Sequence, residues 1–243
     1  YNGDGDMDII LTTIDDVRVM DNDGMADPSF TLEFLNTSVT PRCVSSTMGD
    51  LDGDGNTDFI CASLLENDIH WYQNDGQTNP SFSPFLIDEY QHIISDLNIG
   101  DVDGNGYPDI VTASWVGNNH NWYQHNGDSS PTFTLRELNV GDGGQTHIGF
   151  DEPYLTDIVD VDGDGDFDLI SSSLDTLTDH IMVWYQNDGQ STPEFTRFEN
   201  LDLYLDPKAI DYGDMDGDGD IDLLSSYHEN IDFMWHEKMN TND

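Results

Sequence analysis

Short apolar runs recur along the chain, and acidic or glycine-containing stretches separate them. Five of these runs directly follow an aspartate, at 9–11, 59–61, 110–112, 169–171 and 223–225. Other runs precede the acidic stretches, as at 43–48 and 92–94. Runs of this length, together with the alternating pattern at 30–34 and 133–136, predict β-strands rather than helices.

The predicted strands belong to an internal repeat. The third position of the acidic loop falls at Asn2, Asp52, Asp103, Asp162 and Asp216, with spacings of 50, 51, 59 and 54 residues. After each loop except the first comes an aromatic pair, at 71–72, 122–123, 184–185 and 235–236. An Asn-Asp-Gly or His-Asn-Gly turn follows in the first four repeats, with proline and phenylalanine at fixed offsets beyond its glycine. Each repeat therefore reads strand, acidic loop, strand, strand, turn, strand, the pattern of a propeller blade.

We therefore expect an all-β fold, a β-propeller of four-stranded antiparallel blades with about five repeats present. The repeats lie approximately at 1–40, 41–90, 91–140, 150–200 and 206–243, within a single propeller segment spanning 1–243. The chain begins inside an acidic loop, after the first strand of blade 1, and leaves after the third strand of blade 5. We expect a segment excised from a longer chain, in which further blades or the missing strands complete the ring.

The acidic loop has a composition that suits a metal ion. Its fourth copy, 160–168, places aspartate at positions 1, 3, 5 and 9 and glycine at positions 4 and 6. Carboxylates crowded in this way repel one another unless a cation lies among them, and oxygen ligands in a flexible, glycine-containing loop suit Ca²⁺. An EF-hand would need flanking helices and a glutamate at position 12. Here that position holds Cys61, Thr112, Ser171 and Ser225, and the flanking runs predict strands, so the pattern does not fit an EF-hand.

Charge limits the partners that the chain can bind. Its 243 residues include 50 Asp and Glu against 6 Lys and Arg, a formal net charge of −44, which five divalent ions would reduce only to −44 + 10 = −34. Such an acidic surface argues against binding nucleic acid or an anionic membrane, and no apolar run approaches the roughly 18 residues of a membrane span. Cys43 and Cys61 lie on strands predicted to be hairpin neighbours. The sequence leaves two alternatives open, a disulfide between them or two buried free thiols.

The loop Asp-x-Asp-Gly-Asp-Gly-x-x-Asp-hydrophobic, paired with Trp-Tyr-x-Asn-Asp-Gly, resembles the FG-GAP/VCBS repeat family. Its calcium loops are similar to those in the β-propeller of integrin α subunits. The resemblance covers nearly the whole chain and implies a propeller, commonly seven-bladed, with Ca²⁺ in the loop between the first two strands of each blade. It implies very little about activity, because the repeat occurs in adhesion receptors, surface proteins and propeller enzymes alike.

Carried over residue by residue, the resemblance implies side-chain ligands at loop positions 1, 3, 5 and 9 and a backbone carbonyl at position 7. The residues are Asn2, Asp4, Asp8 and the carbonyl of Asp6; Asp50, Asp52, Asp54, Asp58 and the carbonyl of Asn56; Asp101, Asp103, Asn105, Asp109 and the carbonyl of Tyr107; Asp160, Asp162, Asp164, Asp168 and the carbonyl of Asp166; and Asp214, Asp216, Asp218, Asp222 and the carbonyl of Asp220. Four to five structural Ca²⁺ ions are expected. Loop 1 lacks its first ligand, and loop 3, with one carboxylate fewer, is expected to bind more weakly than loops 2, 4 and 5.

The function we expect is that of a non-enzymatic, extracellular, calcium-binding module for adhesion or assembly within a larger surface or secreted protein, with an unidentified protein or glycan partner. Its location would be the cell surface, the medium or a secretory lumen. Two alternatives are a propeller domain of a polysaccharide-active enzyme and a calcium-dependent lectin. The aromatic pairs suit either sugar stacking or packing between blades, and we favour packing, with Trp115 the better candidate for an exposed contact. The insertion at 141–147 is either a linker or a binding feature.

Overall fold

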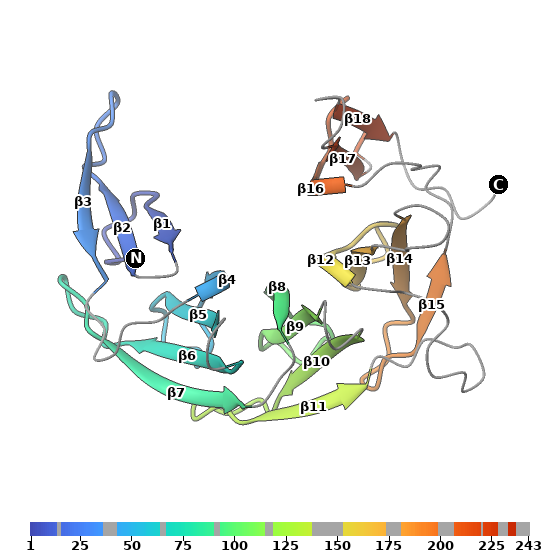
Figure 1. The fold of residues 1–243 in the computed structure, drawn as a ribbon, viewed down its shortest axis with the longest axis horizontal. Helices are drawn as coiled ribbons and strands as arrows, with labels where there is room; N and C mark the ends of the chain where they lie inside the picture. The colour runs from blue at the N-terminus through green and yellow to red at the C-terminus, as the bar shows by residue number, and fades with distance from the viewer. Residues whose placement is uncertain are drawn as a thin grey trace.

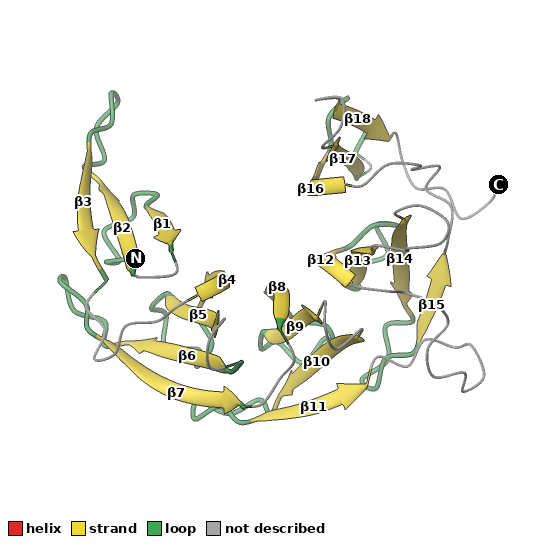
Figure 2. Cartoon of the chain, viewed as in Figure 1, coloured by secondary structure: helices red, strands yellow, loops and turns green. Residues whose placement is uncertain are grey.

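The computed structural model describes residues 1–13, 16–35, 43–63, 67–89, 93–114, 119–137, 153–173, 181–198, 207–219, 221–227 and 233–236. Every regular element within these residues is a β-strand (Figure 2), which confirms the all-β class. No α-helix able to cross a lipid bilayer is found in this part of the chain. Trp115, Asp220 and the insertion at 141–147 lie outside the described residues.

The strands form five antiparallel sheets, and in each sheet consecutive strands are neighbours. The sheets comprise β1 (Ile9–Thr12), β2 (Val17–Asn22) and β3 (Phe30–Phe34); β4 (Cys43–Gly49), β5 (Asp58–Ser63), β6 (Ile69–Asn74) and β7 (Phe82–Asp88); β8 (Ile94–Gly100), β9 (Asp109–Ser114), β10 (Asn119–His125) and β11 (Phe133–Glu137); β12 (Pro153–Val159), β13 (Asp168–Ser173), β14 (Ile181–Asn187) and β15 (Phe195–Phe198); and β16 (Pro207–Gly213), β17 (Asp222–Tyr227) and β18 (Phe233–His236). We call these sheets blades 1 to 5. The three middle blades have the predicted four strands, and blades 1 and 5 have three described strands each.

The five blades stand side by side around an arc, in chain order (Figure 1). Strands β4, β8, β12 and β16 lie on the inner side of the arc, and β3, β7, β11 and β15 lie on the outer side. In blades 2 to 5 the acidic loop joins the innermost strand to the next one. The arrangement is therefore propeller-like, and it places every acidic loop at the same point of its blade.

The innermost strands are the elements that the apolar pattern located least well. The run at 92–94 predicts a strand there, but β8 begins at Ile94 and continues through Asp96 and Asn98, while His92 lies outside the described residues. These polar residues contact neighbouring blades. Asn98 Nδ2 donates to the carbonyl of Thr156 at 3.0 Å, and Asp96 accepts a hydrogen bond from the Ser45 hydroxyl at 2.9 Å. Polar bonds between blades therefore stand beside the apolar face of β8, in which Ile94 and Leu97 are buried.

The hydrophobic core is divided among the interfaces between blades. Trp71 of blade 2 packs with Ile110 and Tyr123 of blade 3, and Trp184 of blade 4 packs with Leu223 of blade 5. Trp122 packs against blade 4 in the same way. The expectation that the repeated tryptophans fill the space between blades is therefore confirmed for these three residues.

A glycine at the end of the innermost strand lets adjacent blades approach closely. A Cβ atom on Gly49 would collide with the side chain of Ile99, and one on Gly100 would lie 2.7 Å from Cγ2 of Ile158. Val159 is the equivalent residue of blade 4, and Tyr212 of blade 5 packs against its cluster. The isoleucine of the following blade thus packs directly against the backbone of this glycine.

A disulfide links Cys43 of β4 to Cys61 of β5, with their Cα atoms 5.4 Å apart. Both cysteines are buried at the interface between blades 1 and 2, among Val17, Phe59 and Tyr72. Of the two alternatives that the sequence left open, the structure therefore contains the bridge.

Replacing a repeated tryptophan should destabilise the fold only where a following blade covers it. We expect Trp184→Ala to lower the free energy of unfolding by about 3–5 kcal/mol, because the indole is fully buried. Trp235→Ala is the matched control, since Trp235 is exposed and an exposed substitution changes stability by about 0.5 kcal/mol or less. Urea unfolding of both variants at low protein concentration measures the difference, and equal losses would contradict the assignment.

Candidate metal centres in the acidic loops

Each acidic loop is folded around its own carboxylates. In loop 4, Gly163 and Gly165 adopt φ angles of 76° and 98°, which residues with a side chain rarely reach. These turns direct backbone N–H groups inward. Asp160 accepts hydrogen bonds from the N–H groups of Gly163 at 2.8 Å and Gly165 at 3.0 Å, and Asp162 accepts one from Asp164 at 3.2 Å. The spacing of aspartate and glycine therefore produces a compact loop with its carboxylates on the inside.

Four loops bring three carboxylates close enough to share one cation. Within each group one oxygen of each residue lies within 4.8 Å of the others, and the groups are Asp50, Asp52 and Asp58; Asp101, Asp103 and Asp109; Asp160, Asp162 and Asp168; and Asp214, Asp216 and Asp218. Ligand oxygens that lie 2.3–2.6 Å from a Ca²⁺ ion are separated by up to roughly 5 Å, so this spacing fits a single ion. Several aspartate groups could therefore hold metal ions.

The remaining predicted ligands are placed less uniformly. The position-5 residues Asp54 and Asp164 each accept the N–H of the residue two positions later, and they belong to no group of three. In loop 5, Asp222 lies outside the group that contains Asp218. Asp220, whose carbonyl is a predicted ligand, lies outside the described residues.

Loop 1 forms no such group among the residues that the structure describes. Its position-9 residue, Asp8, accepts a hydrogen bond from the nitrogen of Tyr1 at 2.6 Å, the contact that the position-2 N–H makes in the other loops. The position-3 residue is Asn2, whose side-chain oxygen Oδ1 accepts the N–H of Asp4 at 3.0 Å. Loop 1 therefore keeps the shape of the other loops with fewer convergent carboxylates.

The position-9 aspartate is the most buried carboxylate of each loop. Asp58 accepts the N–H of Leu51 at 3.1 Å and the N–H of Asn74 at 2.8 Å, so it ties the start of the loop to the end of β6. Asp109 and Asp168 make the equivalent pairs of bonds. Burial raises the pKa of Asp58 and of Asp168 to about 6, and that of Asp109 to about 7. A bound cation would favour the charged form of these carboxylates, which burial disfavours.

A glutamine that the sequence analysis did not single out contacts three of the groups. Nε2 of Gln73, Gln124 and Gln186 donates to the position-3 carboxylate of Asp52, Asp103 and Asp162, respectively. The residue directly follows the Trp-Tyr pair in all three repeats, and this recurrence was the available signal. The glutamine fixes the orientation of one carboxylate from the neighbouring strand.

In blade 1 the same contact is made with the roles exchanged. The loop contributes an amide, Asn2, and the strand contributes a carboxylate, Asp21, with Nδ2 of Asn2 donating to Oδ1 of Asp21 at 2.9 Å. The hydrogen bond is retained although both residues differ from those in the other blades. This exchange also removes a carboxylate from the loop itself.

The asparagine of the Asn-Asp-Gly turn connects each loop to the loop of the preceding blade. Nδ2 of Asn74 donates to the carbonyl of Thr57 in its own blade at 2.9 Å and to the carbonyl of Tyr1 in blade 1 at 3.0 Å. Nδ2 of Asn187 bonds to Phe167 and, at 2.8 Å, to Val102 of blade 3. The turn is therefore part of the junction between blades.

Blade 3 has His125 at this position and makes the same junction. Nδ1 of His125 accepts the N–H of Gly127, so Nε2 carries the proton and donates to the carbonyl of Leu51 in blade 2 at 2.9 Å. Its ring is stacked on Tyr107 of loop 3, with centroids 5.0 Å apart and planes inclined by 7°. In this repeat His125 stands where the turns of blades 2 and 4 have asparagine, and Tyr107 stands at position 7 of the loop. Their rings stack in place of the contact that the asparagine amide makes with its own loop.

The loops recur in the way that a known repeat family does. The FG-GAP-like repeat family matches the chain over residues 1–61, 50–112 and 160–225. The chain belongs to this family. Each FG-GAP-like match runs from one acidic loop through the strand that follows the next loop, so it spans one junction between blades. No curated protein sequence matches the chain.

Among solved structures, the chain is similar to a lectin of Agrocybe aegerita that specifically recognises non-reducing terminal N-acetylglucosamine. The TM-score is 0.51 at 16% identity, over 92% of this chain and 72% of the lectin. BBS1N in complex with ARL6DN aligns at a TM-score of 0.49 and 8% identity, over 93% of this chain and 73% of that one. The V. cholerae biofilm matrix protein Bap1 aligns at 0.37 and 18%, over 88% and 43%. At these identities the lectin informs the fold alone, and it agrees with the propeller-like arrangement.

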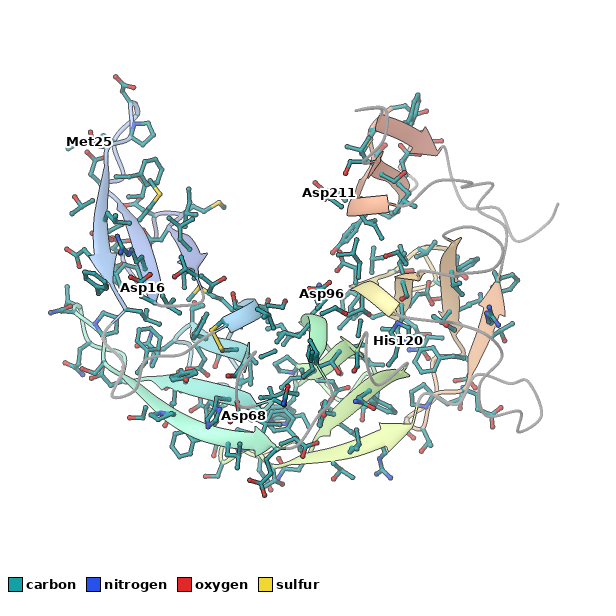
Figure 3. The ribbon with its side chains drawn as sticks, in the orientation of Figure 1. Asp16, Met25, Asp68, Asp96, His120 and Asp211 are labelled. Carbon is teal, nitrogen blue, oxygen red and sulfur yellow. A yellow bond between two sulfur atoms is a disulfide. The ribbon has the colours of Figure 1, made fainter. Side chains whose placement is uncertain are left out.

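A second group of carboxylates lies on the innermost strands, away from the acidic loops. Asp96 and Asp211 project on the inner side of the arc (Figure 3). Asp96 accepts the N–H of Thr156 of blade 4 at 3.0 Å, and burial raises its pKa. Burial also raises the pKa of Asp157 to about 6, and the nearby charges of Asp96 and Asp211 raise it further. These residues lie at the contacts between blades, and the sequence pattern did not predict that role.

The raised pKa of Asp157 predicts a pH-dependent effect of its removal. The unfolded side chain titrates near pH 4, so between roughly pH 4 and 6 the folded protein holds a proton that the unfolded chain lacks. That contribution to stability is lost as the pH rises through about 6. Asp157→Asn imitates the protonated form, and we expect it to raise the thermal midpoint most at about pH 7.5, by less at about pH 5, and not at all below about pH 4.

Asp23→Asn provides a control of opposite sign. N–H groups of Ser29 and Met25 bind this carboxylate and hold its pKa below the usual range. Its contribution to stability is therefore present at neutral pH and is lost as the pH falls. Thermal unfolding of both variants across this pH range checks the two signs, and a uniform rise for Asp157→Asn at both pH values would refute the assignment.

Proposed function

We propose that this chain is a calcium-binding, extracellular β-propeller module that serves adhesion, protein interaction or assembly within a larger surface or secreted protein. The observation that carries the proposal is the convergence of three carboxylates within 4.8 Å in each of four successive loops. Buried carboxylates with raised pKa values, surrounded by further oxygen atoms, suit a hard divalent cation. The proposed propeller is a closed ring with more blades than the five described here.

The role of calcium in this proposal is structural. The residues that would hold it are those at positions 1, 3 and 9 of loops 2 to 4, such as Asp50, Asp52 and Asp58, and Asp214, Asp216 and Asp218 in loop 5. A bound Ca²⁺ ion would neutralise part of the loop charge. Because position 9 also anchors the third strand of the blade, binding to the native state stabilises the whole blade by mass action.

An extracellular location is supported by the disulfide between Cys43 and Cys61, because disulfides persist mainly in oxidising compartments. Calcium affinities of about 10⁻⁴–10⁻³ M are typical of modules that work outside the cell. The net charge of −44 disfavours nucleic acid as a partner, and we propose a protein or a glycan instead.

A calcium-dependent lectin is the second candidate, and the similarity in fold to the Agrocybe aegerita lectin favours it. The repeated tryptophans Trp71, Trp122 and Trp184 are buried, so a glycan would have to be bound by other groups. A glycan array probed with and without calcium separates this candidate from a protein-binding module. Turnover on a panel of polysaccharides tests the remaining alternative, a polysaccharide-active enzyme.

Removing calcium should strongly destabilise the protein. We expect chelation to lower the thermal midpoint and to release about four to five Ca²⁺ ions per chain, because the loop carboxylates then repel one another without a counterion. Thermal unfolding and metal analysis by mass spectrometry measure the two effects. In a site-resolved titration, loop 3 should bind calcium more weakly than loops 2, 4 and 5. No metal and no shift would refute the proposal.

The glutamine beside each site should control calcium affinity. We expect Gln186→Ala to weaken calcium binding in loop 4 on the order of tenfold or more, because the carboxylate of Asp162 loses the donor that orients it. Gln190→Ala is the matched control, since Gln190 lies in the exposed turn of the same blade and its side-chain amide donates to the backbone carbonyl of Asp188 at 3.4 Å. Calcium titration calorimetry of both variants gives the comparison, and equal affinities would show that the glutamine has no such role.

A further inference from the structure

A small hollow lies between loops 3 and 4, at the junction of blades 3 and 4. Residues 101–104 of loop 3 and 165–167 of loop 4 line it, together with Gly189 of the Asn-Asp-Gly turn. The position-9 carboxylates Asp109 and Asp168, which are the buried members of the two metal-binding groups, do not line it. The hollow is therefore distinct from the two candidate metal centres, although one of its walls belongs to loop 3.

A tyrosine fills the equivalent place between loops 2 and 3. Tyr107, at position 7 of loop 3, has ring atoms 3.8 Å from a Cβ atom built on Gly53 of loop 2 and 3.7 Å from one built on Gly127 of its own turn. Position 7 of loop 4 is Asp166, and among the described residues nothing lies within 4 Å of a Cβ atom built on Gly104, the counterpart of Gly53. The hollow thus marks the space that an aromatic side chain occupies one blade earlier.

A carboxylate and a phenyl ring stand together in the wall that loop 4 provides. The carboxylate of Asp166 lies against the turn, because a Cβ atom on Gly189 would collide with it, and it forms no ion pair within the described part of the chain. Phe167 is 40% exposed. The residues equivalent to Phe167 in loops 2 and 3 are Thr57 and Pro108, so only loop 4 of these three places an aromatic ring here.

The walls stay negatively charged even when calcium is bound. Residues 160–168 include five aspartates and residues 101–109 include three. One divalent ion in each loop would neutralise two of these charges and leave the rest. The hollow therefore attracts a cationic group and repels an anionic one.

The size of the hollow limits its guest to the end of one side chain. It encloses about 80 Å³, well below the roughly 300–1,000 Å³ of pockets that hold whole organic ligands. Among cationic side chains, the guanidinium group of arginine is planar, stacks on aromatic rings and donates two parallel hydrogen bonds to a carboxylate. The ammonium group of lysine has no plane to stack.

The chain itself contains a guanidinium group bound by the same two partners. Nη2 of Arg18 lies 2.8 Å from the carboxylate of Asp16. Cζ of Arg18 lies 4.7 Å from the centre of the Phe34 ring, within the range of a cation–π contact. A carboxylate and a phenyl ring are also the two groups that the hollow offers.

We propose that the hollow between loops 3 and 4 binds the guanidinium group of an arginine on a protein partner. Asp166 accepts its hydrogen bonds, and the ring of Phe167 stacks on it. This inference rests on the protein-interaction function proposed above and adds the chemistry of the partner. Arginine is enriched among the residues that contribute most to protein interfaces, so one such contact acts as an anchor within a larger interface.

Titration of the calcium-loaded chain with N-acetyl-arginine amide, followed by two-dimensional NMR of the backbone N–H groups, tests the proposal. We expect saturable shifts at Gly104, Gly165 and Gly189. The equivalent lysine derivative should bind about threefold or more weakly, because it cannot stack. The citrulline derivative, which is planar but uncharged, should not bind.

Three variants identify the groups responsible. Asp166→Tyr copies the residue of loop 3, keeps the backbone carbonyl that is the predicted calcium ligand, and should abolish binding by filling the hollow. Phe167→Thr copies loop 2 and should weaken binding about threefold or more. Asp128→Asn is the matched control, since it removes one exposed carboxylate from the turn of blade 3 and should leave the affinity unchanged. Metal analysis and thermal unfolding of each variant confirm that it is folded and loaded with calcium.

The outcomes separate this inference from the function on which it rests. Calcium uptake without arginine binding would overturn the inference alone, and a chain that takes up no calcium would refute the proposed function. Equal binding of the arginine and lysine derivatives, or shifts spread evenly over the surface, would show attraction by net charge only and would also overturn it. A response to the methyl glycoside of N-acetylglucosamine in place of arginine would assign the hollow to a glycan.

Discussion

The carboxylate at the ninth position of each acidic loop is the interaction on which the rest of this architecture depends. Asp58, Asp109 and Asp168 each accept one N–H group from the start of the loop and another from the third strand of the blade. One side chain therefore closes the loop and sets the position of two strands. Because it is buried, its charge has to be offset by nearby donors or by a cation, which makes the surrounding acidic loop part of the fold.

Each blade of this chain depends on its neighbours for stability. The core lies between blades rather than within them, and Asn74, His125 and Asn187 bond loops of adjacent blades together. A repeat of this kind cannot bury its faces alone and depends on its neighbours. The acidic loops and the blade interfaces are consequently one connected structure, since the same turn residue contacts both.

The sequence allowed the blade pattern to be predicted because its main determinants are local. The alternation of aspartate and glycine sets the loop conformation, and the apolar run after it continues as β1, β5, β9, β13 and β17. The tryptophans were assigned to packing between blades because they recur once in each repeat. The innermost strand β8 was not located correctly, since Asp96 and Asn98 bond to Ser45 and Thr156, far away in the sequence.

The candidate sites were predictable to a similar degree. In loops 2 to 4 the predicted carboxylates at positions 1, 3 and 9 converge, because the loop itself brings them together, whereas in loop 5 the group contains position 5 instead of position 9. The role of Gln186 depends on how the third strand is placed against the loop, and the exchanged pair of Asn2 and Asp21 depends on the same placement in blade 1. The recurrence of the glutamine after each Trp-Tyr pair signals a role for it, but spacing along the chain does not show which loop carboxylate it contacts.

The glycine at the end of the innermost strand has a geometric consequence for the whole assembly. At Gly49 and Gly100 the neighbouring isoleucine rests on the backbone, whereas blade 4 has Val159 at this point. A larger side chain at this position needs more room between the inner strands than glycine does. At a given outer spacing, a wider inner spacing makes the wedge angle between two blades narrower, and more blades are then required to complete one turn. The side-chain volume at this position therefore bears on the number of blades in a ring.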